Sequence, residues 1–504
     1  MKADAPIAPH GEDIADNTLA KEWNDLDWNR IKEHVSGMQS RISKATKLGQ
    51  NDRVKRLSYL LTHSFDAKAL AVKKVTSNKG KRTPGVDGIL WLKPEDKMNA
   101  AKTLSGKGYR AKPLRRIYIP KSNGKLRPLS IPTMYDRAMQ ALYALALDPI
   151  AEAKGDPSSF GFRIGRCAQD AAESIHVCMN SKCNREWVME TDIKSCFDGI
   201  SHEYIMENIP MDRKVLGQFL KAGFVYRHKM FPTGEGVPQG GVISPIIANM
   251  VLDGLEKALA EQFPAKRKHH AARARLIRYA DDSICACSTK EIAEECKIIT
   301  REFMAQRGLE ISEEKTVITN ITDGFDFLGF NFRKRHGHLL VTPSKKSVKR
   351  LLKGLHELIL EDGLAISQGE LIKAINLKIV GWGNYHKHNC SKKCFHDIDH
   401  ILWQMLWRWA RRRHMNKGAG WLRNRYWKTI NGKPWVFTDG KETLVFLADV
   451  PIKRHIPLKR TMNPYIDREY FIRRRETIRK TERKIRPRPL SPSDKRVVHT
   501  VRAV

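Results

Sequence analysis

The stretch RYADDSICAC, from Arg278 to Cys287, decides how this sequence is interpreted. It places two adjacent carboxylates, Asp281 and Asp282, between two short runs of β-forming residues, which predicts a hairpin with the acids at its turn. Upstream, the apolar residues from Trp187 to Met189 form a second strand pattern that runs directly into Asp192. If this strand neighbours the hairpin, Asp192 and Asp281 converge on one face at the end of a sheet.

Three clustered carboxylates indicate a metal-dependent reaction. Such a cluster is strongly self-repelling unless divalent cations lie between the acids, and two bound cations are the requirement of metal-assisted phosphoryl transfer. Hard oxygen ligands favour Mg²⁺ over zinc. The cysteines and histidines are therefore not needed for catalysis.

The charge of the chain predicts a nucleic-acid partner. Its 504 residues include 91 Lys and Arg against 55 Asp and Glu, a net charge of +36. A broad positive field of this size attracts phosphate chains. The alternative is a solvated surface or a structural protein of the ribosomal kind, but here the basic residues are interleaved with aromatic and apolar motifs.

The cysteines and the hydropathy pattern indicate a soluble protein of a reducing compartment, which we expect to be cytoplasmic. Nine cysteines lie at scattered spacings without CxxC pairs, which favours free, mostly buried thiols and makes structural zinc improbable. Apolar runs stay well below the roughly 20 residues of a membrane span, so we expect no membrane contact.

The N-terminal part of the chain has a helical pattern from Trp23 to about Val75, followed by the basic, Gly- and Pro-rich loop NKGKRTPGVDGI at residues 78–89. Between Arg115 and Phe332, strand-like and helical runs alternate, which predicts an α+β domain. Residues 115–132 form a predicted hairpin with its turn at Ser122 to Gly124.

Further elements follow from spacing and capping residues. Ser244 as N-cap and Pro245 at the first helical position predict one helix with Ile247, Val251, Leu255 and Leu259 on a single face. GFDFLGFNF, at residues 324–332, alternates like a strand. Beyond Thr342 we expect long helices, one from about Phe395 to Arg413 with Trp409 packed inside. The last 54 residues, with 17 Lys and Arg against 5 Asp and Glu, predict a basic appendage.

Five ordered motifs resemble those of reverse transcriptases of the group II intron type. They are DIxxxFD from Asp192, QGGxxSP from Gln239, YADD from Tyr279, the GLEI and KT stretch ending at Lys315 and Thr316, and FLGF from Phe327. The resemblance extends from about Trp23 to Arg474, and a set of five motifs is far more specific than one short pattern.

The resemblance implies a right-hand polymerase, in which fingers and palm, with an antiparallel palm sheet, precede an α-helical thumb or maturase domain. The expected divisions are a helical extension at 1–75, fingers and palm at 76–335, thumb and maturase domain at 336–440, and a basic DNA-binding region at 441–504. Asp192 and Asp281 match the main ligands of two Mg²⁺ ions. Asp282 matches a supporting acid, and the Ile193 carbonyl is a further expected ligand.

The same resemblance assigns roles around the incoming nucleotide. Phe197 matches the bulky aromatic that lies under the sugar and clashes with a 2′-hydroxyl, which selects dNTPs. Gln239 matches a residue near the templating base pair, and Tyr279 would lie near the primer end. A core position is the alternative for Phe197.

Three basic residues match the family's phosphate contacts. Lys121 and Arg127 correspond to finger residues that grip the triphosphate, and Lys315 corresponds to a lysine near the γ-phosphate. Paired cations are suited to neutralising phosphate charge. Each residue taken alone is equally compatible with an ordinary surface cation.

Candidate RNA-binding residues follow from two further stretches. Arg163 and Arg166 lie in the family-like SSFGFRIGRCAQDA and would shape the template channel. Trp382, Tyr385 and Lys387 lie in IVGWGNYHKHNC, which resembles the maturase domain and interleaves rings with cations, a combination suited to folded RNA. For these last three residues, helix packing is an equal alternative.

The implied function is an RNA-directed DNA polymerase of a mobile group II intron that also promotes splicing and supports retrohoming. Its partners would be the intron RNA, a template-primer, target DNA and dNTPs. The region after Tyr470 has no cysteine, so we expect no zinc-supported HNH endonuclease and priming from a nascent strand instead. The alternatives are a splicing factor with little polymerase activity, or another bacterial reverse transcriptase class.

Overall fold

The computed structural model divides the protein into two compact units. Unit 1 contains residues 1–167, 188–318 and 459–472, and unit 2 contains residues 168–187, 319–458 and 473–504. Each unit is considered by itself. The residues that the structure describes are 11–120, 124, 126–180, 185–264, 273–430 and 432–481, so that Lys121 and Cys183 lie outside them.

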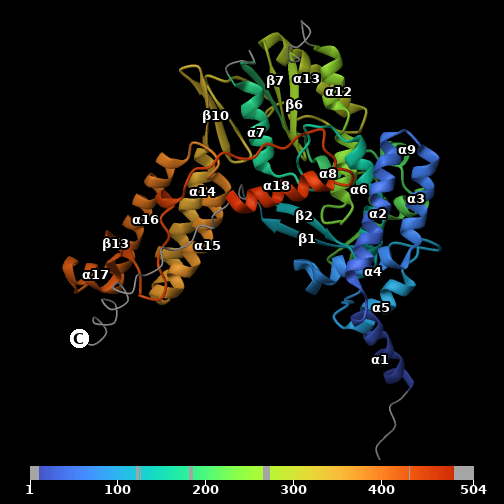
Figure 1. Cartoon of the computed structure of the whole chain (residues 1–504), viewed down its shortest axis with the longest axis horizontal. Coiled ribbons are helices and arrows are strands. Elements are labelled where there is room, and N and C mark those ends of the chain that lie inside the picture. The colour runs from blue at the N-terminus through green and yellow to red at the C-terminus, as the bar shows by residue number, and fades with distance from the viewer. Residues whose placement is uncertain are drawn as a thin grey trace, which may run out of the picture. The chain divides into compact units, whose positions relative to one another are not determined.

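Unit 1 begins with helices, as the pattern between Trp23 and Val75 predicts (Figure 1). In α2, Asp27 caps the N-terminus by accepting from the Asn29 and Arg30 amides, and Ile31 and Val35 begin its buried face. The helices are α1 (Gly11–Asn24), α2 (Trp28–Lys47), α3 (Asn51–His63), α4 (Phe65–Ser77), a short 3₁₀ turn (Lys79–Arg82) and α5 (Pro94–Thr103).

The predicted basic hairpin is present. β1 (Leu114–Pro120) pairs antiparallel with β2 (Leu126–Ile131), and β1 also runs parallel to β4 (Phe224–Tyr226), which pairs with β5 (Lys229–Phe231). The following helix, α6 (Met134–Lys154), is buried along most of its length. Short helices α8 (Cys196–Gly199), α9 (His202–Asn208) and α10 (Arg213–Leu220) lie between β3 and β4 in the chain.

A second four-stranded sheet carries the acidic motifs. Its strand order is β6-β7-β3-β8, in which β6 (Ala274–Tyr279) and β7 (Asp282–Cys287) form the predicted antiparallel hairpin. β3 (Trp187–Thr191) lies next to β7, as the sequence required for the acids to converge, and β8 (Val317–Asn320) forms the edge. Helix α13 (Lys290–Ala305) packs on both strands of the hairpin. The chain turns after the helix at Gly308, which has φ +75°.

The single helix predicted from Ser244 is wrong in two respects. Ser244 is the first helical residue and Ile243 the N-cap, and the helix breaks into α11 (Ser244–Leu252) and α12 (Leu255–Gln262). The break falls at Asp253 and Gly254, where Gly254 has φ +102°. Leaving the helix frees the Asp253 carboxylate to accept from the Asp156 amide and to pair with Arg278.

Unit 2 combines a small sheet with long helices. Residues 324–332 form two strands, because Leu328 and Gly329 adopt φ +50° and +81° and reverse the chain. The prediction of one strand there is therefore wrong. The sheet consists of β9 (Phe325–Phe327), β10 (Phe330–Arg335) and β11 (His338–Pro343), all antiparallel. A further helix of this unit is α7 (Ala168–Met179).

The long helices expected beyond Thr342 are present. They are α14 (Lys345–His356), α15 (Gln368–His386) and α16 (Lys392–Arg413), followed by α17 (Ala419–Tyr426) and the hairpin of β12 (Trp427–Ile430) and β13 (Lys433–Phe437). Trp409 is 0% exposed at the centre of their shared apolar core. Helix α16 ends at Arg413, as predicted, and its last turn contains Arg411, Arg412 and Arg413.

The predicted C-terminal appendage is partly folded into the two units. Residues 459–472 belong to unit 1, where the Tyr465 hydroxyl donates to Asp148 and Arg460 donates to the Ser158 hydroxyl over 2.8 Å. Helix α18 (Arg468–Thr481) contains the last described residues. Within the described part of the chain, no helix has the length and apolar character needed to cross a bilayer.

Candidate active site

The structure brings the three predicted aspartates to one end of the β6-β7-β3-β8 sheet. Asp192 directly follows β3, Asp281 lies in the hairpin turn, and Asp282 is the first residue of β7, paired with Tyr279. β3 and β7 are neighbours in the sheet, and Asp282 is repelled by both Asp281 and Asp192, so the three acids meet at the same end of the sheet. Lys315 joins them, with its ammonium 2.9 Å from Asp192 Oδ2.

The electrostatics of this edge reflect the crowding of like charges. Desolvation of the Asp282 carboxyl, followed by repulsion from Asp281 and Asp192, raises its pKa from 3.8 to about 6. The hydrogen bond to Asp192 raises the pKa of Lys315. Asp281 and Asp192 therefore lie close enough to Asp282 to oppose its ionisation, and Lys315 offsets only part of that repulsion.

The backbone after β3 orients a further oxygen. The Ser312 amide donates to the Asp192 carbonyl over 2.7 Å, and the Lys194 amide donates to the Glu310 carbonyl over 2.9 Å. Between these bonds, Ile193 and Ile311 form an antiparallel bridge. This makes them a pair without mutual hydrogen bonds, so the Ile193 carbonyl points away from that partner strand.

These oxygens fit a hard divalent cation. Carboxylate and carbonyl oxygens are the ligands that Mg²⁺ prefers, and a cluster that raises its own pKa gains stability when a cation enters. The lysine at Asp192 shows that the edge already attracts positive charge. Asp192, Asp281, Asp282 and the Ile193 carbonyl are the residues able to hold such ions.

The hairpin turn rests on a tightly fitted backbone segment. Ala280 adopts φ +58°, and a Cβ on Gly161 would lie 2.3 Å from the Ala280 nitrogen. The Arg278 amide donates to the Ser158 carbonyl over 3.0 Å, and the Phe160 amide donates to the Arg278 carbonyl over 2.8 Å. Only glycine at position 161 permits this approach.

Arg278 holds the same turn from inside the protein. Its side chain is 1% exposed and donates to Asn249 Oδ1 over 3.0 Å and to the Ala280 carbonyl over 3.2 Å. It also pairs with Asp253 at the break between α11 and α12. The Asn249 side chain in turn donates to the Gly161 carbonyl over 2.9 Å. In the sequence Arg278 is recognisable only as the first residue of RYADD, and its partners, distant along the chain, gave no signal of this role.

The Gly-rich loop at residues 236–241 places Phe197 and Gln239 together. The Val237 amide donates to the Phe197 carbonyl over 2.7 Å, and a Cβ on Gly236 would lie 2.6 Å from that carbonyl oxygen. Gln239 Nε2 donates to Asp198 Oδ2 over 3.1 Å. The main-chain carbonyl of Gln239 accepts from the Ser130 amide at the end of β2. Phe197 is half-buried, a short chain distance from Asp192.

Phe162 is an aromatic residue at this site that the sequence analysis did not single out. Its ring meets the Phe197 ring edge to face at 6.5 Å. It adopts φ +60° and is 56% exposed, an unusual combination for a large apolar residue. Its occurrence in SSFGFR directly before Arg163 was the available signal.

Three family models match successive parts of the chain. The N-terminal domain of reverse transcriptase matches residues 23–104, and reverse transcriptase (RNA-dependent DNA polymerase) matches residues 119–332. The maturase-specific domain of group II introns matches residues 348–427.

Curated relatives carry the same signal. YkfC of Escherichia coli is 31% identical over 352 residues, which cover 61% of this chain and 91% of YkfC. LtrA of Lactococcus lactis, a group II intron-encoded protein, is 29% identical over 387 residues, which cover 64% of this chain and 63% of LtrA. This chain belongs to the family of group II intron-encoded reverse transcriptases and maturases.

A putative intron protein of Saccharomyces cerevisiae, from COX1/OXI3 intron 1, is 28% identical over 58% of the chain and 40% of its own length. Among solved structures, apo telomerase from Candida tropicalis aligns with a TM-score of 0.36 and 16% identity over 47% of this chain and 56% of that chain, which is too low to carry an argument. The relatives therefore support the family and its RNA-directed DNA polymerase domain.

Two of the residues predicted to bind RNA in this reverse transcriptase are occupied inside the protein. Arg163 forms a bidentate pair with Glu152, over 2.8 and 2.7 Å, and donates to the Asp156 carbonyl. Arg166 donates to the Pro157 and Ser159 carbonyls, and its side chain is 2% exposed. Both side chains thus hold the segment from Glu152 to Ser159 together, and an RNA contact of Arg163 or Arg166 stays a prediction.

The aromatic residues of the maturase-type region also face the protein. Trp382 donates to the Ser347 hydroxyl over 3.0 Å, and the Tyr385 hydroxyl donates to the Leu328 carbonyl over 2.8 Å. The Tyr385 ring stacks on Phe330 at 5.0 Å. Lys387 is 6% exposed and donates to Asn384. The packing alternative therefore has contacts in the structure, while RNA contact of the half-buried Trp382 and Tyr385 stays a prediction.

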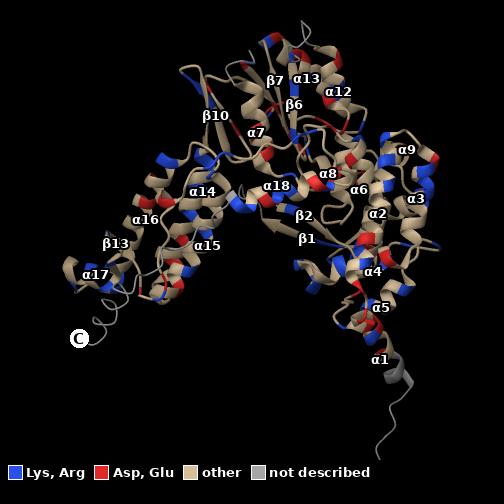
Figure 2. Cartoon of the chain, in the orientation of Figure 1, with Lys and Arg blue, Asp and Glu red and all other residues tan. Residues whose placement is uncertain are grey.

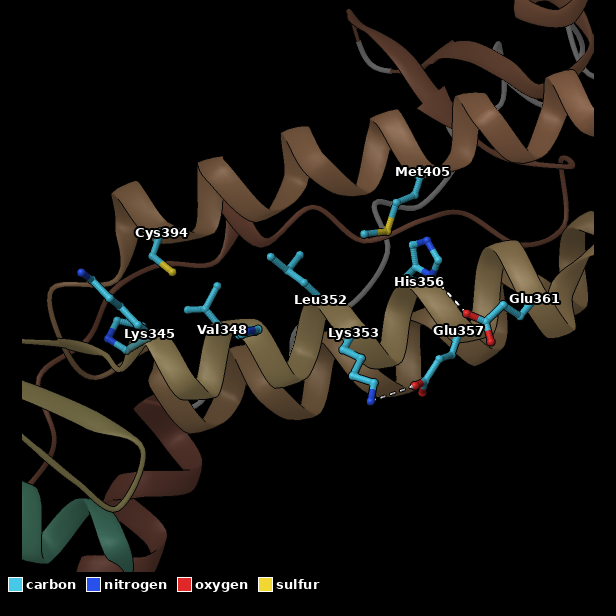
Figure 3. A pocket seen from close by; sticks show the side chains of 11 residues that line it. Lys345, Val348, Leu352, Lys353, His356, Glu357, Glu361, Cys394 and Met405 are labelled. Atoms are coloured by element: carbon cyan, nitrogen blue, oxygen red, sulfur yellow. Dashed lines mark ion pairs between the residues drawn. The ribbon is translucent and has the colours of Figure 1, made fainter. Parts of the chain in front are cut away.

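An open groove between α14 and α16 has a different character. Its volume is about 690 Å³, with an apolar floor that includes Val348, Leu352 and Met405 (Figure 3). Lys345, Lys349 and Lys353 recur every fourth residue on its α14 side and are exposed. Figure 2 shows basic residues repeated along α14. Glu357 and Glu361 also line the groove, and Lys353 pairs with Glu357 over 3.7 Å.

Proposed function

We propose that this protein copies RNA into DNA for a mobile group II intron, promotes splicing of that intron, and supports its retrohoming. The observation that carries the proposal is the meeting of Asp192, Asp281 and Asp282 with Lys315 at one sheet edge. Target DNA, dNTPs and the intron RNA are its proposed partners, in the cytosol or at the nucleoid.

The finer architecture belongs to the same proposal. Unit 1 would supply fingers and palm, with the β6-β7-β3-β8 sheet as the palm, and the helices α14 to α17 of unit 2 would supply the thumb. We retain divisions at residues 75/76, 335/336 and 440/441 as proposed domain boundaries. Residues 459–472 of the proposed basic region fold with unit 1.

Two Mg²⁺ ions, when bound, would lower the pKa of the primer 3′-hydroxyl and neutralise charge on the triphosphate and leaving pyrophosphate. Asp192 and Asp281 would bind them, with Asp282 and the Ile193 carbonyl in support. Lys315 would exchange its contact with Asp192 for the nucleotide phosphates, since the same ammonium is suited to both. Arg127, exposed on β2, and Lys121 would approach the triphosphate from the fingers.

The remaining residues would select and align the substrates. Phe197, supported by the edge of Phe162 and by the Gly236 backbone, would exclude the 2′-hydroxyl of a ribonucleotide. Gln239 would lie by the templating pair, at a loop held on β2. Tyr279, paired in register with Asp282, would lie by the primer end.

Primer extension tests the polymerase activity. The full-length protein is given a DNA primer on an RNA template with Mg²⁺ and dNTPs, beside Asp281→Asn and the exposed control Asp323→Asn. We expect extension by the parent and the control only. Absence of extension by the folded parent contradicts the proposal and favours a splicing factor with little polymerase activity.

Splicing at low Mg²⁺ tests the maturase activity, with α14 as the proposed RNA surface. The intron is expected to splice only with protein present. Lys345→Ala, Lys349→Ala and Lys353→Ala together should weaken RNA binding and reduce its dependence on salt, by about one unit of slope per lost phosphate contact. Lys257→Ala, which removes an exposed charge on α12, is the control. Equal splicing without protein contradicts the proposal.

A further inference from the structure

Three buried cysteines meet behind the catalytic hairpin. Cys285 and Cys287 lie on β7, and Cys296 lies on α13, which packs against it. Their sulfur atoms are separated by 3.7 Å (Cys285–Cys287), 3.8 Å (Cys285–Cys296) and 3.9 Å (Cys287–Cys296). All three are 0% exposed. Strand alternation puts residues 285 and 287 on one face, which is how a spacing without a CxxC pair becomes a cluster.

The triangle of sulfurs has the size of a three-coordinate metal site. Thiolate–metal bonds of about 2.3 Å in a trigonal plane place the sulfurs roughly 4.0 Å apart, close to the separations found here. Among the described residues, the cluster contains no fourth His, Cys, Asp or Glu ligand. Structural zinc takes four ligands, whereas a soft monovalent ion such as Cu(I) accepts thiolates alone.

The protonation of the cluster supports metal binding. The Cys285 and Cys287 thiols both donate towards the Cys296 sulfur; these hydrogen bonds lower the pKa of Cys296, and the same contacts together with burial raise the pKa of Cys285. A thiolate, the form that binds metals, is therefore favoured at one corner of the triangle. The burial of all three sulfurs also excludes water from the site.

We propose that Cys285, Cys287 and Cys296 form a binding site for Cu(I) in three-coordinate thiolate geometry. Binding forms three Cu–S bonds and releases the remaining thiol protons to solvent, with no change of oxidation state. The ion would link α13 to β7, the strand that begins at Asp282. The proposal rests on the fold and is independent of the proposed polymerase activity.

Competition with a chelator tests the site in the full-length protein. Cu(I) is supplied without oxygen as its bicinchoninate complex, in a parent carrying Cys390→Ser to remove an exposed thiol. We expect the parent to retain one equivalent of copper and Cys296→Ala to lose it. Cys178→Ala, which removes a buried thiol on α7 outside the cluster, should retain it. No retention by the parent, or equal retention by Cys296→Ala, overturns the proposal.

X-ray absorption on the copper-loaded parent decides the matter without a core variant, should Cys296→Ala fail to fold. We expect three sulfur neighbours at about 2.3 Å. Two sulfurs, or nitrogen and oxygen neighbours, overturn the proposal, and so does preferential retention of Zn(II) in a four-coordinate sphere.

Discussion

The acidic end of the β6–β7 hairpin and the aromatic face of α15 use their polar groups in opposite ways. At the hairpin, like charges are held together, and the pKa of Asp282 is raised to about 6 by desolvation and by Asp281 and Asp192. On α15, Trp382 and Tyr385 donate to a hydroxyl and a carbonyl of their own unit. Like-charged carboxylates held together imply a bound cation, whereas aromatic side chains whose polar atoms already have hydrogen-bond partners stabilise the fold.

The largest expected effect breaks the hairpin side of this comparison. Asp281→Asn should lower the rate of primer extension by about 10³-fold, since the transition-state stabilisation lost with a metal ligand is worth several kcal/mol. Because one repelling charge disappears, its unfolding temperature without divalent ions should equal or exceed that of the parent. Single-turnover extension and thermal unfolding measure both effects. A variant that loses stability together with activity would indicate a structural role for Asp281.

The support beneath the turn should matter next. Arg278→Lys keeps the charge but loses the planar fork that binds Asn249, the Ala280 carbonyl and Asp253. We expect about a 10- to 100-fold fall in kcat with little change in the KM for dNTP, as for partners that orient metal ligands.

The control for Arg278 is Arg307→Lys. Arg307 is also buried, but its guanidinium binds the Val251 and Phe303 carbonyls away from the hairpin. It should lose stability and keep kcat. An equal loss of kcat in both variants would reduce the role of Arg278 to general stability.

Sugar selection tests the aromatic pair beside the acids. Phe197→Ala should reduce the preference for dGTP over GTP by about 10- to 100-fold in kcat/KM, the range available to a shape-based pocket. Phe162→Ala, which removes only the edge contact with Phe197, should cause a smaller reduction. The comparison of the two nucleotides in single-nucleotide incorporation measures it. An unchanged ratio in Phe197→Ala would place that ring in the core.

The sequence was sufficient for the hairpin and its partner strand because charge and strand periodicity agree there. Asp281 and Asp282 have to lie at a solvent-facing turn, and the apolar residues that precede Asp192 have to form a buried strand. Both requirements can be read locally. The same holds for the end of α16, where Arg411 to Arg413 favour the helix terminus.

Other features depend on partners far apart in the sequence. The helix break at Asp253 exists because that carboxylate pairs with Arg278, and Arg163 is buried because Glu152 lies opposite it. A stretch of aromatic and basic residues such as the one around Trp382 and Tyr385 is typical both of helix packing and of RNA binding, so its periodicity could not distinguish these two roles. The meeting of Cys285, Cys287 and Cys296 likewise needed the placement of α13 on β7.

A smaller effect sharpens the α15 side of the comparison. Tyr385→Phe removes the hydroxyl that donates to the Leu328 carbonyl, and it should lower the free energy of unfolding by about 1 kcal/mol. RNA affinity should be unchanged, because the ring stays stacked on Phe330. Chemical denaturation and filter binding of intron RNA measure the two quantities. Weaker binding at unchanged stability would restore the RNA contact originally predicted for Tyr385.

The smallest effect concerns pH in protein freed of divalent ions. The folded-state pKa of Asp282 is about 6 against an ordinary 3.8, so the folded protein holds this proton more tightly than the unfolded chain. Its contribution to stability is complete below pH 3.8 and is lost as pH rises to about 6. Asp282→Asn should therefore match the parent in acid and unfold at a higher temperature near neutrality.

Solvent at this exposed position screens the effect of the Asp282 charge, so the difference in unfolding temperature should be modest. Saturating Mg²⁺ should stabilise the parent more than the variant, and a difference between them that does not depend on pH would show that the acids at the sheet edge do not repel one another.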